Sequence, residues 1–352
     1  MEPLTHFLTG ACLARAGFNR HTALATLTMT LAAEANDIDI VAYFKGQTFG
    51  FAHHRGITHT FVGVPFVAAA VVLLVWIIEQ ARRQFENQEK RRARLRRRGL
   101  PADANWPLLY GCALLACLSH LLLDFTNNYG VRPFEPFSYK WYAWDIVYIV
   151  EPLLYVALLG GLVVPRLGSL INEEIGARAN RPRGQVGAIF ALLGVLAVWG
   201  VRDYEHRQAV SALNSRVYQG ADPVSVSAFP YPLNPFRWYG VAETRDFYAR
   251  MEVVNGEVDP LGRMAIRYKP EESDATLTAK QTYLGRVFLD WARYPVLEAE
   301  TRDDPRRYTV RFIDLRFRYP DSHQALLSPR VDLNGDLKPT AFWWGQRKEP
   351  IR

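Results

Sequence analysis

The feature that most constrains this chain is an apolar run of 18 residues, Phe61 to Ile78, that contains no charged side chain. A helix needs about 20 mostly apolar residues to cross a bilayer, so this run predicts a membrane span. Backbone polar groups in lipid must pair internally, which favours helices. The sequence therefore predicts a multi-pass α-helical membrane domain with about four spans: Phe61–Ile78, Trp106–Asp124, Ile146–Val164 and Val186–Val201.

The segment before these spans, residues 6–35, is interrupted at Gly17-Phe18-Asn19-Arg20. Each half is about 12 to 15 residues long, which is too short to cross a bilayer. A hairpin of two short helices would return the chain to the side on which it started. A single tilted span through residues 7–35 is the competing interpretation.

The charge distribution predicts an orientation. Residues 82–98 hold nine basic and two acidic side chains, and residues 165–185 hold four arginines and two glutamates. Basic loops beside spans mark the cytoplasmic side. Residues 40–60, 125–145 and 202–352 would then lie outside, in the periplasm if the host membrane is a bacterial inner membrane. Because the net charge of +7 comes largely from one loop, we expect lipid contact there and no nucleic acid.

The last part of the chain has the composition of a soluble domain. The pattern predicts a membrane domain at 1–201, a Pro-rich linker at 202–234 and a small antiparallel β-rich domain at 235–352. Residues 247–254 followed by Asn255-Gly256 predict a hairpin, and residues 308–317 alternate as a half-buried strand would. The three cysteines lie in apolar segments and indicate no compartment.

Residues 53–60, His-His-Arg-Gly-Ile-Thr-His-Thr, concentrate three histidines and an arginine beside the first span. Imidazole is the commonest metal ligand. On the predicted topology these residues share the outer face with further polar side chains: His6, Asp37, Asp39, His120, Asp124 and Asp145. His120 and Asp124 are spaced i, i+4, on one helix face. They form either a pair of metal ligands or a structural hydrogen bond.

These motifs resemble those of the YdjM-like family of membrane-bound metal-dependent hydrolases. The family pattern is His, then Asp-x-Asp, then His-Arg-Gly-x-Thr-His-Ser, then His-x-x-x-Asp, and residues 1–160 carry it in order. The motifs are also similar to those of the zinc-dependent phospholipase C and nuclease superfamily. This chain has Ile40 where the family often has histidine, and Thr60 in place of serine. Gly130 and Pro133 stand where further phospholipase ligands would follow, so we expect one or two ions rather than three.

The resemblance implies roles for particular residues. Asp37, His59, His120 and Asp124 would hold the main ion, with Asp124 bridging to a second ion held by His6. Mixed nitrogen and oxygen ligands suit Zn²⁺, with Mn²⁺ and Fe²⁺ as alternatives. The catalytic and supporting roles are carried by four more residues: Asp39 would orient or deprotonate water, Arg55 would bind a phosphate oxygen, His54 would act as ligand, donor or acid, and Thr58 would be secondary.

Two acidic residues near the third span are candidates for a supporting role. Asp145 stands at its outer end and Glu151 lies within it. Ionisable residues in lipid face the interior of a helix bundle. Glu151 either supports the site or forms a helix-packing hydrogen bond beside a kink at Pro152.

The resulting hypothesis is an inner-membrane hydrolase that uses a metal-activated water on a phosphoester in a lipid or lipid-linked substrate. A membrane metallopeptidase or acyl hydrolase is the alternative enzyme. A metal-binding envelope scaffold is the non-catalytic alternative. The protein partner of the β domain is not indicated by the sequence.

Overall fold

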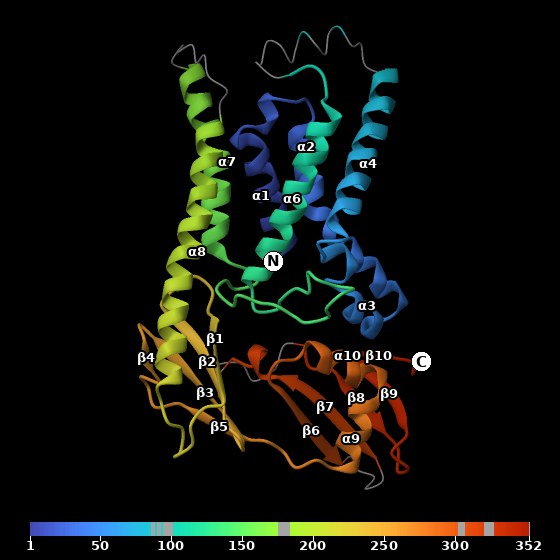
Figure 1. Ribbon diagram of the computed structural model, residues 1–352, viewed down its shortest axis with the longest axis vertical. Helices are drawn as coiled ribbons and strands as arrows, with labels where there is room; N and C mark the ends of the chain where they lie inside the picture. The colour runs from blue at the N-terminus through green and yellow to red at the C-terminus, as the bar shows by residue number, and fades with distance from the viewer. Residues whose placement is uncertain are drawn as a thin grey trace. The chain divides into compact units, whose positions relative to one another are not determined.

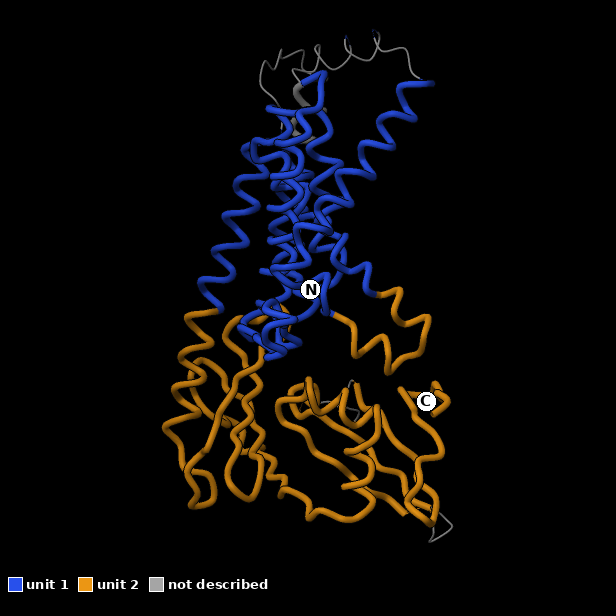
Figure 2. The backbone as a smooth tube through the Cα atoms, turned by 45° about the vertical axis from the view of Figure 1, so that its right-hand side comes forward, with its two compact units in different colours: residues 1–39, 55–202 blue, residues 40–54, 203–352 orange. Residues whose placement is uncertain are grey.

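The computed structural model describes residues 1–85, 89, 93, 101–174, 184–301, 307–319 and 327–351. It divides into two compact units, residues 1–39 with 55–202 and residues 40–54 with 203–352 (Figure 2). The first unit is helical and the second contains antiparallel sheets, so the predicted fold class is confirmed. Most of the basic residues used to predict orientation lie outside the described residues.

The first unit is a bundle of helices (Figure 1). Its elements, in chain order, are α1 (Pro3–Ala16), the 3₁₀ turn η1 (Phe18–Arg20), α2 (Ala25–Ala35), η2 (Asn36–Lys45, which continues into the second unit), η3 (Ile57–His59), α4 (Val64–Phe85), α6 (Trp106–Thr126), α7 (Pro152–Glu174) and α8 (Gln185–Asn214, which also continues into the second unit). Helices α4, α6 and α8 are long and apolar enough to cross a membrane, while the described apolar part of α7 is shorter.

Helices α1 and α2 form the predicted hairpin rather than a single tilted span. They approach closely at Gly10, where an added Cβ would lie 2.6 Å from the Met29 carbonyl oxygen. Small residues allow this close approach between helices. The apolar core that α2 shares with α4 and α6 includes Met29, Val71 and Cys117.

The third span begins later than predicted. Helix α7 begins at Pro152, and the prediction that it starts at Ile146 is wrong. Proline suits the first turn of a helix, and it disfavours helical backbone in the residue before it. Glu151 therefore precedes the helix instead of lying inside it, and Pro152 starts α7 instead of kinking it. Helices α7 and α8 pack closely at Gly161 and Gly187.

The second unit contains two five-stranded antiparallel sheets, in the orders β1-β2-β3-β4 (with β5 on β3) and β10-β9-β8-β7-β6. An aromatic-rich core that includes Phe229, Tyr239 and Tyr294 lies between them. The elements are α3 (Gln47–His53), β1 (Ser225–Pro230), β2 (Arg237–Glu243), β3 (Phe247–Val254), β4 (Glu257–Val258), β5 (Ala265–Tyr268), α9 (Asp274–Gln281), α10 (Tyr283–Trp291), β6 (Pro295–Thr301), β7 (Tyr308–Asp314), the 3₁₀ turn η4 (Leu315–Phe317), β8 (Arg330–Leu333), β9 (Pro339–Trp344) and β10 (Arg347–Glu349).

Two sequence predictions for this unit meet different outcomes. The hairpin at Asn255-Gly256 is confirmed, with both residues at positive φ between β3 and β4. The predicted linker differs from the structure, because α8 continues to Asn214 and β1 occupies 225–230. Leu213 packs into the space left by Gly240 on β2, which gives the end of α8 a place in this core.

Candidate metal centre

Two histidines and two aspartates come together in the first unit from three separate parts of the chain. Asp37 lies in η2 just after α2, His59 ends η3, and His120 and Asp124 lie one turn apart on α6. One ligand atom from each lies within 4.8 Å of the others. These are the four residues predicted to hold the main metal ion.

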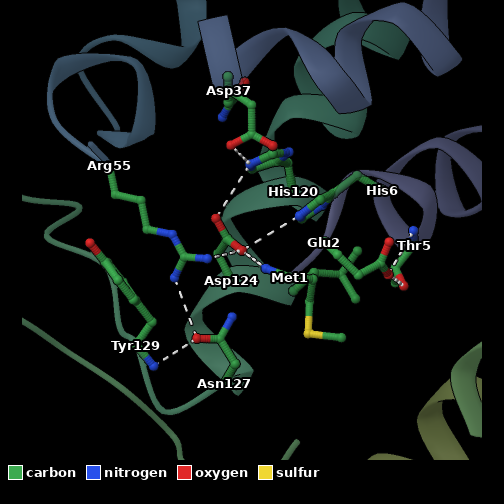
Figure 3. Close-up of polar contacts among 12 residues, drawn as sticks. Met1, Glu2, Thr5, His6, Asp37, Arg55, His120, Asp124, Asn127 and Tyr129 are labelled. Carbon is green, nitrogen blue, oxygen red and sulfur yellow. Dashed lines mark hydrogen bonds and ion pairs between the residues drawn. The ribbon is translucent and has the colours of Figure 1, made fainter. Parts of the chain in front are cut away.

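The Nε2 atoms of His59 and His120 form the centre of this cluster, 3.0 Å apart. Asp37 Oδ1 lies 3.4 Å from the first and 3.5 Å from the second. Asp124 Oδ2 lies 3.4 Å from each, and Figure 3 shows both carboxylates beside His120. Two nitrogen lone pairs repel at such a distance, so a proton or a cation must lie between the rings.

Hydrogen bonds behind both rings aim the Nε2 atoms inward. His120 Nδ1 lies 2.7 Å from the Ala33 carbonyl oxygen and must donate to it. His59 Nδ1 lies 3.1 Å from Thr58 Oγ1 and 3.4 Å from Asp39 Oδ2. Metal-bound histidines have such a carbonyl or carboxylate behind them. The contacts of Asp39 and Thr58 with the back of His59 therefore favour a positioning role for both.

The charges around His59 decide its protonation. Burial acts to lower the pKa of His59, but the nearby carboxylates of Asp124, Asp37 and Asp39 outweigh it and raise the pKa to about 10. Burial acts in the opposite sense on Asp37, and its hydrogen bonds to His120 and His59 hold the pKa of this carboxyl well below its usual range. Without a metal ion, the cluster is a carboxylate–imidazolium network.

A divalent metal ion fits this donor set. Asp124 Oδ2 is buried and makes no hydrogen bond within the described residues, so it has a lone pair directed at the two Nε2 atoms. Two imidazoles, whose Nδ1 atoms have partners, and two carboxylates form a mixed nitrogen and oxygen site of the kind used for zinc. Manganese and iron accept the same ligands, so the donors define a class of ion rather than one metal.

The second oxygen of Asp124 faces positive groups. Its Oδ1 accepts from Arg55 Nη2 at 2.7 Å and from the amino group of Met1, and His6 Nε2 lies 3.5 Å away (Figure 3). A buried carboxylate is costly unless it is paired. Arg55 and the cluster thus share the charge of one aspartate.

Arg55 is a buried residue at φ +52° whose guanidinium has several contacts. Nη1 donates to the Gly130 carbonyl at 2.8 Å and contacts Asn127 Oδ1 at 3.4 Å, and the guanidinium lies 4.7 Å from the Tyr129 ring centre. These partners in the loop after α6 were not apparent from the sequence. They hold the guanidinium in place beside Asp124, so that Arg55 acts as the counter-ion of this carboxylate. The Nε atom of Arg55 has no hydrogen-bond partner among the described residues.

His6 lies beside the cluster but is not one of its four members. Its ring stacks on His120 with centroids 3.7 Å apart. Both ring nitrogens are buried, and neither has a hydrogen-bond partner within the described part of the chain. Among the described residues, no second group of three or more metal-ligating side chains includes His6. The second ion at His6 and Asp124 remains a prediction.

The other predicted residues lie elsewhere. His54 belongs to the second unit, where its ring is 6.4 Å from that of Tyr43. Asp145 is buried at φ +61° in the loop before α7. Glu151 pairs with Arg202 on α8 at 2.6 Å, both fully buried. This ion pair supports the helix-packing interpretation of Glu151. Arg202 was missed, although a charge directly after an apolar span is a signal for such a partner.

Comparison with known proteins identifies the family of this chain. Residues 1–208 match the family described as "YdjM inner membrane protein". The chain belongs to the YdjM inner membrane protein family. It is also similar to a protein of Bacillus subtilis (strain 168) described as "Uncharacterized protein YfhP", with 24% identity over 332 residues that cover 90% of this chain and 87% of the other. No solved structure matches the chain.

The family match covers every residue of the cluster and extends to the part of α8 that follows Arg202. The resemblance to the YdjM family stated from the motifs is therefore confirmed. Residues 209–352, which contain both sheets, lie beyond that match and are covered in part by the similarity to YfhP.

Proposed function

We propose that this YdjM-family protein is a multi-pass inner-membrane hydrolase that uses a divalent metal ion, with zinc as the preferred ion. The observation that supports it best is the pair of Nε2 atoms 3.0 Å apart, flanked by oxygens of Asp37 and Asp124. A hydrogen-bonded imidazole pair alone would need one proton between the rings. It would not need two carboxylates directed at the same point.

A bound ion of this class would lower the pKa of a coordinated water towards about 7. The residues of the chain would hold the ion at His59 and His120, orient His59 through Asp39, and balance the charge of Asp124 through Arg55. We favour a phosphoester in a lipid or lipid-linked molecule as the substrate. Arg55 supports this choice because its Nε is a buried donor without a partner beside the cluster.

We also propose that the cluster and the second unit lie on the periplasmic side. His59 comes just before α4 and Asp124 lies near the end of α6, whereas the basic segment 82–98 joins the other ends of these two helices. The cluster therefore lies at the end of α4 opposite to Arg82 and Arg83, which stand in the last turn of that helix. Basic loops favour the cytoplasm.

The deciding experiment is elemental analysis of the detergent-purified full chain. We expect about one equivalent of zinc, manganese or iron in the wild type, and a loss of at least tenfold in the His120→Ala/Asp124→Ala variant. His53→Ala is the matched control, because His53 is exposed and bonds its own helix at the Phe49 carbonyl. A wild-type protein that neither contains nor takes up a metal ion would overturn the proposal.

A loaded protein would then be assayed on phosphoesters, phospholipids and peptides. Inhibition by phosphate-containing ligands supports a phosphoesterase, and inhibition by hydroxamates supports the peptidase or acyl hydrolase alternative. A metal-binding scaffold would bind the ion and hydrolyse none of them.

A further inference from the structure

We propose that an apolar groove on the outer side of α6 binds an acyl chain of a membrane lipid. The groove has a volume of about 320 Å³, at the small end of the range of about 300–1,000 Å³ typical of ligand pockets. Its lining is almost entirely apolar. The principal side chains are Phe61, Leu118, Leu122, Phe125, Phe134 and Tyr142.

The groove is a built feature, because backbone and ring contacts hold its walls. Phe61 N donates to the Pro133 carbonyl at 2.9 Å, and Val131 and Tyr142 exchange two backbone hydrogen bonds of 2.8 and 2.7 Å. The Phe134 ring packs edge-on against Phe61 and Tyr142, with centroids 5.4 and 5.5 Å apart. The loop after α6 is thus fixed against the start of α4 on one side of the groove.

The groove and the metal cluster both use side chains of α6, and their residues are neighbours along the chain. On α6, Leu121 directly follows His120 and Phe125 directly follows Asp124, so two groove residues alternate with two cluster residues along one turn. Phe61 is two residues after His59. In the loop, Val131 directly follows Gly130, whose carbonyl binds Arg55. A molecule in the groove would therefore contact residues that directly follow cluster residues along α6.

The surroundings of α6 identify the occupant. Helix α6 is long and apolar enough to cross a membrane, and Leu118 and Leu122 are 41% and 45% exposed on it. Lipid tails are the apolar molecules that surround such a face. Because tails are already in an apolar medium, the groove would gain little from the hydrophobic effect. Its effect would be to orient one chain, which is how a site positions a flexible substrate.

This inference rests on the proposed function in one respect: if the protein hydrolyses a lipid, the bound chain belongs to the substrate. The groove lies at the end of α6 that carries Asp124, so the polar end of a lipid seated there would be directed towards the cluster. The substrate class would then be a phosphoester that carries an acyl chain, rather than a small soluble phosphate.

The test is photo-crosslinking of the full chain in nanodiscs of phosphatidylcholine and phosphatidylglycerol. A small fraction of the lipid carries a diazirine midway along one acyl chain, and labelled residues are mapped by mass spectrometry. We expect labelling of groove residues to exceed that of exposed apolar residues on α4 and α8 at least fivefold. Leu122→Trp should fill the groove and abolish this excess. Leu73→Trp, at a residue 57% exposed on α4, is the matched control and should leave it unchanged.

Labelling spread evenly over the lipid-facing helices, or an excess that survives Leu122→Trp, would overturn the proposal. Labelling of peptides from a co-purifying protein seated in the groove would also overturn it. The measurement needs neither metal nor turnover, so it can be repeated on the His120→Ala/Asp124→Ala variant. A wild-type protein that binds no metal while its groove is still labelled would reject the proposed function and leave the lipid site standing.

Discussion

At the scale of single residues, the cluster depends on groups that do not face its centre. Asp39 Oδ2 lies 3.4 Å from His59 Nδ1 and accepts from the Arg55 backbone N–H at 2.6 Å. We expect Asp39→Asn to weaken metal binding by about 10- to 100-fold, because such supporting groups orient the ligand and increase its basicity. Chelator competition would measure this, with the exposed Asp246→Asn as the control. Unchanged affinity together with lost hydrolysis would instead support the original prediction that Asp39 acts on water.

The protonation of His59 makes a second prediction at this scale. Its pKa is raised to about 10 by its carboxylate partners, so the ring carries an extra proton at neutral pH in the metal-free protein. A metal ion must displace that proton, and apparent affinity should rise about tenfold per pH unit below pH 10 and then level off. Titration calorimetry in buffers of different ionisation enthalpy would report about one proton released per ion. Affinity independent of pH between 6 and 8 would contradict this.

At the scale of elements, the α1–α2 hairpin supports the centre from behind. The Ala33 carbonyl of α2 binds His120 Nδ1, and α1 approaches α2 at Gly10. A Cβ on Gly10 would meet the Met29 carbonyl at 2.6 Å and Ala33 Cβ at 2.8 Å. We expect Gly10→Ala to lower the free energy of unfolding by about 1–3 kcal/mol through overpacking, and to weaken metal binding.

Gly111→Ala on α6 is the matched control for Gly10→Ala. No atom lies within 4 Å of its added Cβ, so the free energy of unfolding should stay within about 1 kcal/mol of the wild type or rise. Unfolding by detergent titration and metal affinity would be measured on both variants. Equal unfolding and equal metal affinity in the two variants would show that neither stability nor metal binding depends on the close contact at Gly10.

The sequence predicted those parts that depend on local patterns. Apolar runs predicted the spans, the Asn255-Gly256 pair predicted a turn, and the i, i+4 spacing of His120 and Asp124 placed both on one face. Contacts between distant residues leave no such pattern. The pairing of Glu151 with Arg202 and the hydrogen bond from His120 to a backbone carbonyl are of this kind. The start of α7 does have a local signal, because Pro152 favours the first turn of a helix.

At the scale of the whole molecule, the segment between Asp39 and Arg55 belongs to the second unit. Residues 40–54 follow Asp39 directly and precede Arg55 directly, yet they pack with residues 203–352. Thr48 N donates to the Glu349 carboxylate at 3.1 Å, and Trp344 Nε1 donates to Thr48 Oγ1 at 2.9 Å. The second unit thus holds segment 40–54, which is directly flanked by Asp39 and Arg55.

Phe51 gives a direct test of this connection. Its buried ring contacts Trp291 and Trp344, with centroids 5.1 and 4.8 Å away. Phe51→Ala should lower the free energy of unfolding by about 3–5 kcal/mol. Because the freed segment would no longer fix Asp39 and Arg55, metal affinity should also fall. Val331→Ala, in the core of β8, removes buried volume from the same unit without touching segment 40–54 and is the control. Metal affinity would be measured under conditions in which both variants are folded. An equal fall in the two variants would show that general destabilisation alone weakens metal binding, and that segment 40–54 has no specific effect on it.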